Sequence, residues 1–308
     1  MPAIYPCECI PLEGHQVSFR HKGREAFRWN FGGQYTRPFF HPVNGPSGGN
    51  LVRIGHPGAP NHDHHRGIWF AHTHVSGVNF WAEDGDGRIR QSEWLVYEDG
   101  EDSARMGVRL QWHDGHDATP LITQDVITTF KPRKNGEYTI TIQSKMMPTA
   151  EELELGQTNF GLLAVRVAKS LSEHFGGGTI TNAALKQGEP AIFGKESEWM
   201  DYSGPVRGNN GPAYEGLTYI EHPENISFPS KWHVREDGWM GASLCRDNGV
   251  VIRRDNPLVT RYLIYVHSDK PDIHAIRELQ EELTQQPLFD VVKGTKKHTQ
   301  YQIVESGP

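Results

Sequence analysis

The sequence predicts an all-β protein, an antiparallel β-sandwich with one helix near its C-terminus. Apolar and polar residues alternate with period two along much of the chain. The chain also contains 33 glycines and 20 prolines, which interrupt these stretches at short intervals. Only one segment has helical spacing, so alternating strand-helix-strand units are not expected. We expect residues 1–308 to form a single β-sandwich domain, a size that such folds reach.

The strands are expected where the alternation is clearest. Between residues 106 and 112 every second side chain is apolar, and residues 138–142 repeat the rule. A Lys22-Gly23 turn predicts a hairpin near the N-terminus. The remaining strands are expected at residues 15–20, 25–31, 51–54, 68–74, 122–130, 162–167, 217–221, 250–254 and 262–267.

Two other segments have distinct patterns. Asp272 is suited to cap a helix that Pro287 ends, with four apolar residues at helical spacing between them: Ile273, Ile276, Leu279 and Leu283. Residues 201–214 (DYSGPVRGNNGPAY) have no regular pattern, so we expect a functional loop or lid there.

Composition excludes several partners. The net charge is -7 and there is no run of five Lys or Arg, so neither nucleic acid nor an anionic membrane is an expected partner. No apolar stretch approaches the roughly 20 residues that a membrane-spanning helix needs. Three cysteines are too few for a disulfide framework, and the N-terminus lacks the pattern of a secretory signal. We therefore expect a cytoplasmic protein.

The densest chemical feature is NHDHHRGIWFAHTHVSG, residues 61–77, with five histidines within thirteen positions. In a strand, residues i and i+2 point to the same side, so His62 would pair with His64, and His72 with His74. Two such pairs could hold a divalent metal such as zinc, manganese or calcium, because imidazole nitrogens are common ligands. Asp63, Glu83 or water would complete the shell.

The same cluster allows other interpretations. His65 would point away from the paired rings, toward a hydrogen bond of its own. Arg66 offers a fork for a carboxylate or vicinal hydroxyls, or else forms a surface ion pair. Trp69 would stack on a sugar ring. The histidines could bind substrate directly or serve as buried hydrogen-bonding residues, and these alternatives stay open.

Three further segments carry candidate residues. In Trp232-His233-Val234-Arg235, His233 and Arg235 share one face of a strand. We expect His233 to act in acid-base catalysis, with Trp232 as a substrate contact. The alternative is an edge strand whose polar residues face solvent.

Residues 194–205 offer Lys195 and Asp201 as catalytic groups and Tyr202 as a substrate contact, although Lys195 is also explained as a solvated charge. His41 lies between two prolines, in either a site wall or a rigid edge.

Taken in order, these motifs resemble a soluble bacterial family catalogued as "methane oxygenase PmoA" or as a domain of unknown function. The resemblance covers residues 17–283 and rests on RPFFHP, HDHHRGIWFAH with GVNFW, EWMDYSGP, HPEN with PSKWHVR, and RYLIYVH. It implies a galactose-mutarotase-like β-super-sandwich with a role in carbohydrate metabolism. Asp63 departs from the family's commonest motif, which has proline there. The motif residues carried over are His41, His62, His64, His65, Arg66, His72, Asp201, His233 and Arg235.

We therefore expect an enzyme that acts on a sugar or an oxidised (keto) sugar by proton transfer, as a lyase, epimerase or hydrolase. His233 is the expected base, and the first histidine cluster would polarise the reacting carbonyl. One alternative is a non-catalytic carbohydrate-binding or sensing protein, and another is a metal-dependent oxygenase with a facial triad of two histidines and one carboxylate. No nucleophile elbow, phosphate-binding loop or dinucleotide fingerprint occurs.

Overall fold

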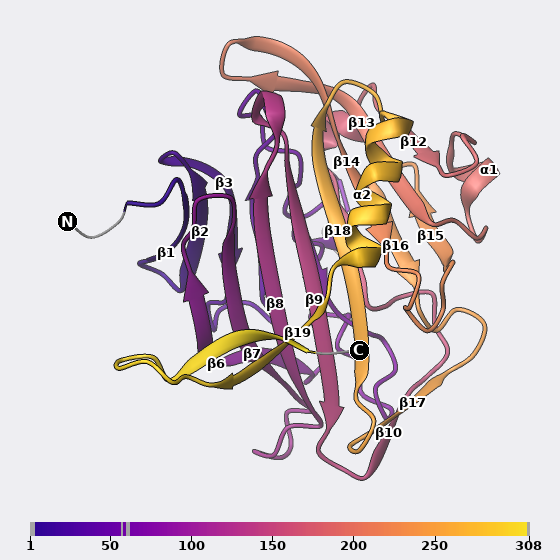
Figure 1. Ribbon diagram of the computed structural model, residues 1–308. Coiled ribbons are helices and arrows are strands. Elements are labelled where there is room, and N and C mark those ends of the chain that lie inside the picture. The colour runs from indigo at the N-terminus through magenta and orange to yellow at the C-terminus, as the bar shows by residue number, and fades with distance from the viewer. Residues whose placement is uncertain (1–3, 57, 60–61, 307–308) are drawn as a thin grey trace.

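Two large antiparallel sheets dominate the computed structural model, which describes residues 4–56, 58–59 and 62–306 (Figure 1). The all-β sandwich expected from the sequence is confirmed. Sheet A has eight strands in the order β1 (Cys7–Leu12), β2 (Gln16–His21), β3 (Arg24–Asn30), β4 (Phe39–Val43), β5 (Ile68–Phe70), β11 (Leu163–Arg166), β16 (Trp239–Ser243) and β15 (Lys231–Arg235).

Sheet B also has eight strands, and two small two-stranded sheets accompany the large ones. Its order is β12 (Thr179–Asn182), β13 (Trp199–Gly208), β14 (Gly211–Glu221), β18 (Leu258–Ser268), β9 (Tyr138–Pro148), β8 (Ile122–Pro132), β7 (Ala104–His113) and β6 (Arg88–Glu98). The small pairs are β10 (Glu152–Leu155) with β17 (Val250–Arg253), and β19 (Leu288–Lys293) with β20 (Tyr301–Ser306).

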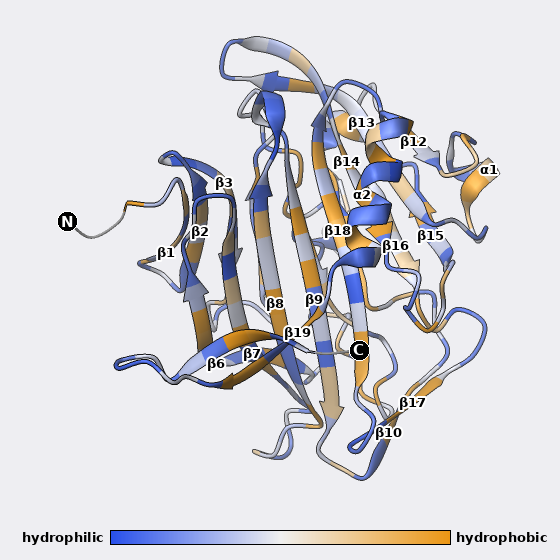
Figure 2. Ribbon diagram, viewed as in Figure 1, coloured by the Kyte–Doolittle hydropathy of each residue, from blue (hydrophilic) through white to orange (hydrophobic). Residues whose placement is uncertain are grey.

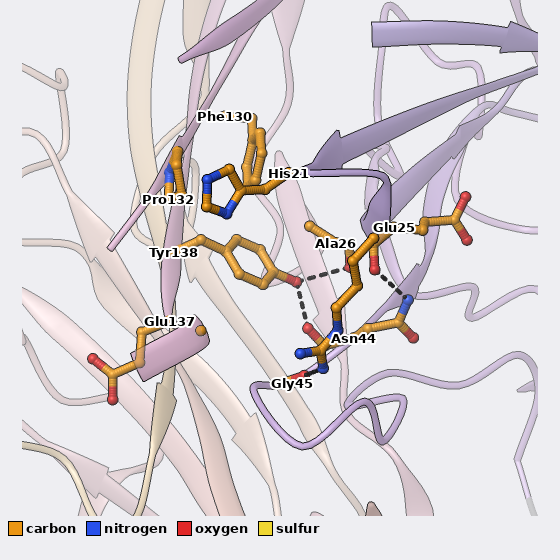
Figure 3. Close-up of a pocket in the computed structure, with 11 residues that line it drawn as sticks. His21, Glu25, Ala26, Asn44, Gly45, Phe130, Pro132, Glu137 and Tyr138 are labelled. Atoms are coloured by element: carbon orange, nitrogen blue, oxygen red, sulfur yellow. Dashed lines mark hydrogen bonds between the residues drawn. The ribbon is translucent and has the colours of Figure 1, made fainter. Parts of the chain in front are cut away.

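The main core lies between the two sheets and draws side chains from both. The Phe27 ring of β3 lies 5.7 Å from Phe130 of β8 and 6.0 Å from Tyr138 of β9, measured between ring centroids. Tyr138 is buried, and its hydroxyl shares its one proton between two backbone oxygens, that of Ala26 in β3 at 3.0 Å and that of Asn44 just after β4 at 2.8 Å (Figure 3). Because a buried hydroxyl needs partners, these bonds fix the two sheets against each other at this end.

The outer face of sheet B is covered by C-terminal elements (Figure 1). Helix α2 (Ile273–Gln285) packs its apolar side on Ile220 and Leu263, and its outward side is hydrophilic (Figure 2). The β19–β20 hairpin lies over β9, where Gln143 exchanges two hydrogen bonds with the backbone of Phe289. Asp272 caps α2 by accepting hydrogen bonds from two backbone N–H groups, as its sequence position predicted. A second helix, α1 (Glu189–Ile192), has a single turn.

Several expected elements differ in the structure. Residues 201–214 do not form an irregular loop, because they belong to the β13–β14 hairpin. Pro205 lies beyond the part of β13 that pairs with β12, so its missing N–H removes no bond on that side. The strand expected at 68–74 ends at Phe70, and residues 51–54 form isolated bridges at Val52 and Ile54 instead of a strand.

Candidate functional site

The outer face of sheet A carries a row of side chains that crosses five strands. Strand register places them side by side in the order Phe39, Trp69, Ala164, Gly241 and His233. A second row, two residues along, contains Arg166 of β11, Trp239 of β16 and Arg235 of β15. Because neighbouring residues of a strand face opposite sides, the residues between these positions supply the sandwich core.

Three indoles cover the small residues of the first row. The ring centroids of Trp69, Trp81 and Trp239 lie 5.0 to 5.7 Å apart. A Cβ atom added at Gly241 would approach Trp239 to 3.1 Å, so the glycine leaves room for this ring. The result is an aromatic floor, defined here as Trp69, Trp81 and Trp239, on the outside of sheet A.

His65 packs against two of these indoles, Trp69 and Trp239. Its ring is nearly parallel to Trp69 and to Trp239, with centroid distances of 5.4 Å to each, and the residue is 6% exposed. Burial, together with the positive charges of His64 and Arg166, strongly lowers the pKa of His65, so the ring is neutral at pH 7. Its Nδ1 atom has no hydrogen-bond partner among the described residues.

The prediction that His65 points away from the other histidines was wrong. It assumed a strand, but the chain turns here, and the His65 N–H donates to the backbone oxygen of His62. The turn folds all three rings together: the centroids of His62 and His65 are 5.1 Å apart, and those of His64 and His65 are 4.2 Å apart. Asn61, the first residue of the motif, lies outside the described residues.

The four histidines proposed as metal ligands are not brought together. The rings of His62 and His64 are 6.0 Å apart. His72 is buried elsewhere, with Nε2 3.0 Å from the Gly156 oxygen, and His74 is exposed, because β5 ends before both residues. Within residues 4–56, 58–59 and 62–306, no group of three or more His, Cys, Asp or Glu is arranged to hold a metal ion.

The two carboxylates that were expected to complete the metal shell, Asp63 and Glu83, are not part of a metal-holding group in the described chain either. Asp63 is exposed. Glu83 is bound by both Nη atoms of Arg66, whose guanidinium lies 5.2 Å from the Tyr35 ring centroid. Burial raises the pKa of Glu83, but hydrogen bonds from Arg66 and Thr36 outweigh burial and lower it to about 2. Arg66 is therefore occupied by an ion pair, the alternative that the sequence left open.

His233 lies on the opposite side of Trp239 from His65. Its ring centroid is 5.8 Å from Trp239, 4.8 Å from Phe160 and 5.3 Å from Phe193, and the residue is 7% exposed. Burial, then the charges of Arg235 and Arg246, lowers the pKa of His233 to about 4, so this ring is neutral too. Its Nδ1 atom has no partner among the described residues.

A pocket of about 260 Å³ begins one row beyond His233. Lys231 and Ser243, which line it, pair with each other at the position two residues from His233. Arg246 also lines the pocket, with its guanidinium 4.9 Å from the Phe193 ring and its Nη1 unpartnered within the described chain. Arg235 bonds Glu189, with Nη1 2.7 Å from Oε1, and its guanidinium lies 5.7 Å from the Phe193 ring that His233 also contacts.

Four predicted site residues lie elsewhere. Asp201 faces the outside of sheet B, where its Oδ2 is 2.7 Å from His267 Nε2. The other side chains do not reach the floor either: Tyr202 and Trp232 belong to the core between the sheets, and Lys195 is exposed. The sequence could not show this separation, because Asp201 and His233 lie on different sheets.

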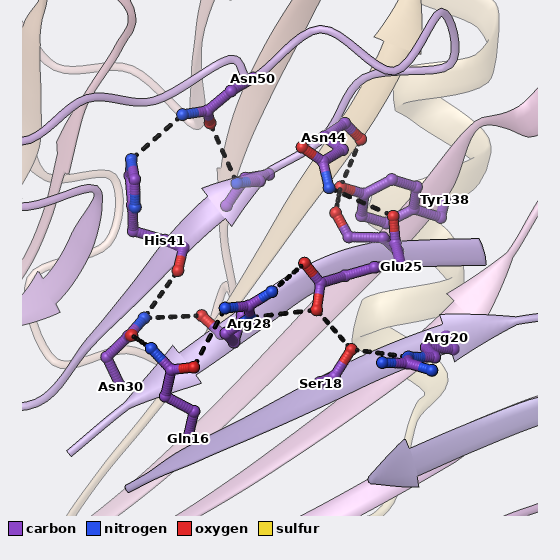
Figure 4. A network of polar contacts seen from close by, with 12 residues as sticks. Gln16, Ser18, Arg20, Glu25, Arg28, Asn30, His41, Asn44, Asn50 and Tyr138 are labelled. Atoms are coloured by element: carbon purple, nitrogen blue, oxygen red, sulfur yellow. Dashed lines mark hydrogen bonds and ion pairs between the residues drawn. The ribbon is translucent and has the colours of Figure 1, made fainter. Parts of the chain in front are cut away.

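His41 belongs to a polar network that includes side chains of β2, β3 and β4 (Figure 4). Its Nε2 lies 3.1 Å from Asn50 Nδ2, and its backbone oxygen accepts a hydrogen bond from Asn30 at 2.6 Å. The network continues to Arg28, which binds Glu25 through Nε and Nη2. His41 therefore belongs to a hydrogen-bonded polar surface of sheet A.

The sequence interpretation missed a buried polar group next to His62, defined here as the Arg166 group: Arg53, His56, Arg166 and Asp237. Arg166 Nη1 is 2.8 Å from Asp237 Oδ1, and His56 Nε2 is 2.9 Å from Asp237 Oδ2. Its sequence signal was Arg166 itself, a lone charge inside the apolar stretch 160–167.

No helix among the described residues is long and apolar enough to cross a membrane. A search of curated proteins gives no match to this chain. A family model, described as a family of unknown function (DUF6807), matches residues 16–281. This match supports the unknown-function part of the expected resemblance, and it supports neither the methane-oxygenase label nor a relation to galactose mutarotases. The chain belongs to the DUF6807 family.

Proposed function

We propose that the outer face of sheet A is the active site of an enzyme that acts on a sugar or an oxidised (keto) sugar by acid-base chemistry, as a lyase, epimerase or hydrolase. One observation carries the proposal: His65 and His233 are buried, neutral imidazoles on opposite sides of Trp239, each with an unpartnered Nδ1. A neutral imidazole can take or give one proton near pH 7.

The aromatic floor supports a carbohydrate as the ligand. Indole faces pack against apolar ring faces, and an indole N–H donates hydrogen bonds to polar groups. The Nε1 atoms of Trp69 and Trp239 are buried and have no partner in the described part of the chain. A sugar ring that reached the floor would therefore meet two N–H donors that the described residues leave unused.

His233 is the base of this proposal. The Asn159 carbonyl acts on its ring as a hydrogen-bond acceptor, which favours a proton on the nitrogen facing that carbonyl. The lone pair of Nδ1 is then free to remove a proton from carbon or from a hydroxyl group. His65 is the electrophile, because a neutral imidazole can donate an N–H to the developing oxyanion.

A divalent metal is not required in this scheme. His62 and His64 would be its first ligands, but among the described residues no group of three or more His, Cys, Asp or Glu is arranged to hold an ion. No step of the proposed reaction therefore involves a metal ion. We also propose a cytoplasmic location, supported by three free, buried cysteines, Cys7, Cys9 and Cys245.

Carbohydrate binding without turnover is the second candidate, and the aromatic floor favours it equally. Solvent exchange separates the two. In D2O, an enzyme of this type incorporates deuterium at carbon or converts one member of a panel of hexoses, methyl glycosides, hexuronates and keto sugars, as seen by proton NMR. A pure binder changes the sugar linewidths alone.

The decisive variants are His233→Gln and His65→Gln, with His274→Gln on the exposed side of α2 as the matched control. We expect the first two to reduce turnover by at least about 100-fold, the usual contribution of a proton-transfer group. The control should retain full turnover. Unchanged turnover in His233→Gln would remove the assignment of the base.

A further inference from the structure

The Arg166 group has more positive charge than its neighbours neutralise. Within the described chain, only one carboxylate contacts this pair of arginines: Arg166 binds the Asp237 side chain at 2.8 Å, while Arg53 Nη2 donates only to the Asp237 backbone oxygen at 2.5 Å. His56 bonds the other oxygen of the same carboxylate. Burying an unpaired charge costs several kcal/mol, so this group favours an additional anion.

Hydrogen-bond donors remain unused in the same place. Arg166 is 1% exposed, yet its Nε and Nη2 atoms have no partner in residues 4–56, 58–59 and 62–306. The Nε and Nη1 atoms of Arg53 and the Nδ1 atom of His62 are likewise buried and unpartnered there. Buried donors without acceptors are rare in folded proteins, so a ligand with acceptor oxygens is the expected partner.

The unused edge of Arg166 has the shape that holds a carboxylate. Nε and Nη2 lie on one side of the guanidinium and present two parallel N–H groups. The same protein uses this edge elsewhere: Arg109 binds Asp125 through Nε at 2.7 Å and Nη2 at 2.9 Å. Arg28 binds Glu25 through the same two atoms.

We propose that the Nε and Nη2 edge of Arg166 binds the carboxylate of the ligand, which makes the substrate class a sugar acid. The inference rests on the proposed function and adds an anion subsite to it. Arg166 and Trp239 are paired neighbours on β11 and β16, so a carboxylate at Arg166 leaves the sugar ring beside the aromatic floor. A planar carboxylate matches one guanidinium edge, and a phosphate would be the competing anion.

The test measures binding of matched pairs by calorimetry: glucuronate with glucose, galacturonate with galactose, and gluconate with sorbitol, with glucose 6-phosphate as the phosphate probe. We expect at least one acid to bind about 10- to 100-fold more tightly than its neutral partner, the size of one charge-assisted pair. Arg166→Met should abolish this preference. Arg253→Met, an exposed arginine on β17, loses the same charge and should keep it.

A second variant changes the preference in the opposite direction. Asp237→Asn removes the resident carboxylate and leaves both guanidiniums to the ligand, so the acid should bind more tightly than to the native protein. Asp237→Asn therefore tests the inference even if Arg166→Met does not fold.

The outcomes separate the two proposals. Equal binding of an acid and its neutral partner would overturn the carboxylate subsite and leave the sugar site standing. Tighter binding of glucose 6-phosphate than of every acid would also overturn it, in favour of a phosphate. Failure of all six sugars to bind the native protein would refute both proposals.

Discussion

Lowering the pH from about 7 to about 5 should destabilise this fold through three buried histidines. Burial lowers the pKa of His72, His222 and His233 from an ordinary 6.5 to about 4 in each case. The folded protein therefore keeps these rings neutral at pH 5, while the unfolded chain protonates them. The unfolded state binds the proton more strongly, so the contribution of these three rings to stability falls as the pH falls from 6.5 to about 4 and then levels off.

The magnitude follows from the same pKa values. One pKa unit corresponds to about 1.4 kcal/mol, so at pH 5 each ring lowers the free energy of unfolding by about 2 kcal/mol. Three rings together cost about 6 kcal/mol, which is comparable to the total stability of about 5–15 kcal/mol of a typical domain. The protein should approach its unfolding transition in mild acid.

The assay is urea unfolding at pH 7 and pH 5, followed by far-ultraviolet circular dichroism. His72→Gln tests one ring, because glutamine can keep the hydrogen bond to Gly156 without binding a proton. Its loss of stability between the two pH values should be about 2 kcal/mol smaller than in the native protein. His274→Gln, at an exposed position on α2, should leave the loss unchanged. Equal losses in His72→Gln and the native protein would refute the reasoning.

Three further substitutions test the packing. Asp272→Ala removes the cap of α2 and should cost about 1 kcal/mol in urea unfolding, and no change would argue against the cap. Asp201→Asn removes the buried negative charge that pairs with His267 and should cost about 3–5 kcal/mol, a value that a loss below about 1 kcal/mol would contradict. Gly67 has a positive φ of 57°, and in Gly67→Ala the new Cβ would clash with the Phe40 carbonyl. We expect thermal unfolding to show a loss of about 3 kcal/mol in stability, and full native stability would disprove the clash.

Local patterns were sufficient for much of the fold. Every second side chain between Met106 and Trp112 is buried, as the alternation predicted, and Asp272 caps the expected helix. The order of strands could not be predicted, because β5 pairs with β11 and β11 with β16 across long stretches of chain. The hairpin at residues 201–214 was missed because glycine and proline hid its alternation.

The candidate site was predicted only in part. The motif at residues 61–77 drew attention to His62, His64 and His65, whose rings lie close together, but the strand assumption gave the wrong ring directions. His72 does not lie with the other histidines, because β5 ends at Phe70. Arg166 and Trp239 had no recognisable motif, since their importance arises from neighbours that the sheet brings together. Side-chain contacts between distant strands are set by register, which one sequence does not display.

The three indoles of the aromatic floor have an optical consequence. Their centroids are 5.0 to 5.7 Å apart, close enough for the electronic transitions of neighbouring rings to interact. Such coupled chromophores give near-ultraviolet signals that depend on their mutual orientation. A molecule that stacks on them would alter this signal. The fraction of protein with a ligand on the aromatic floor can therefore be measured without a label.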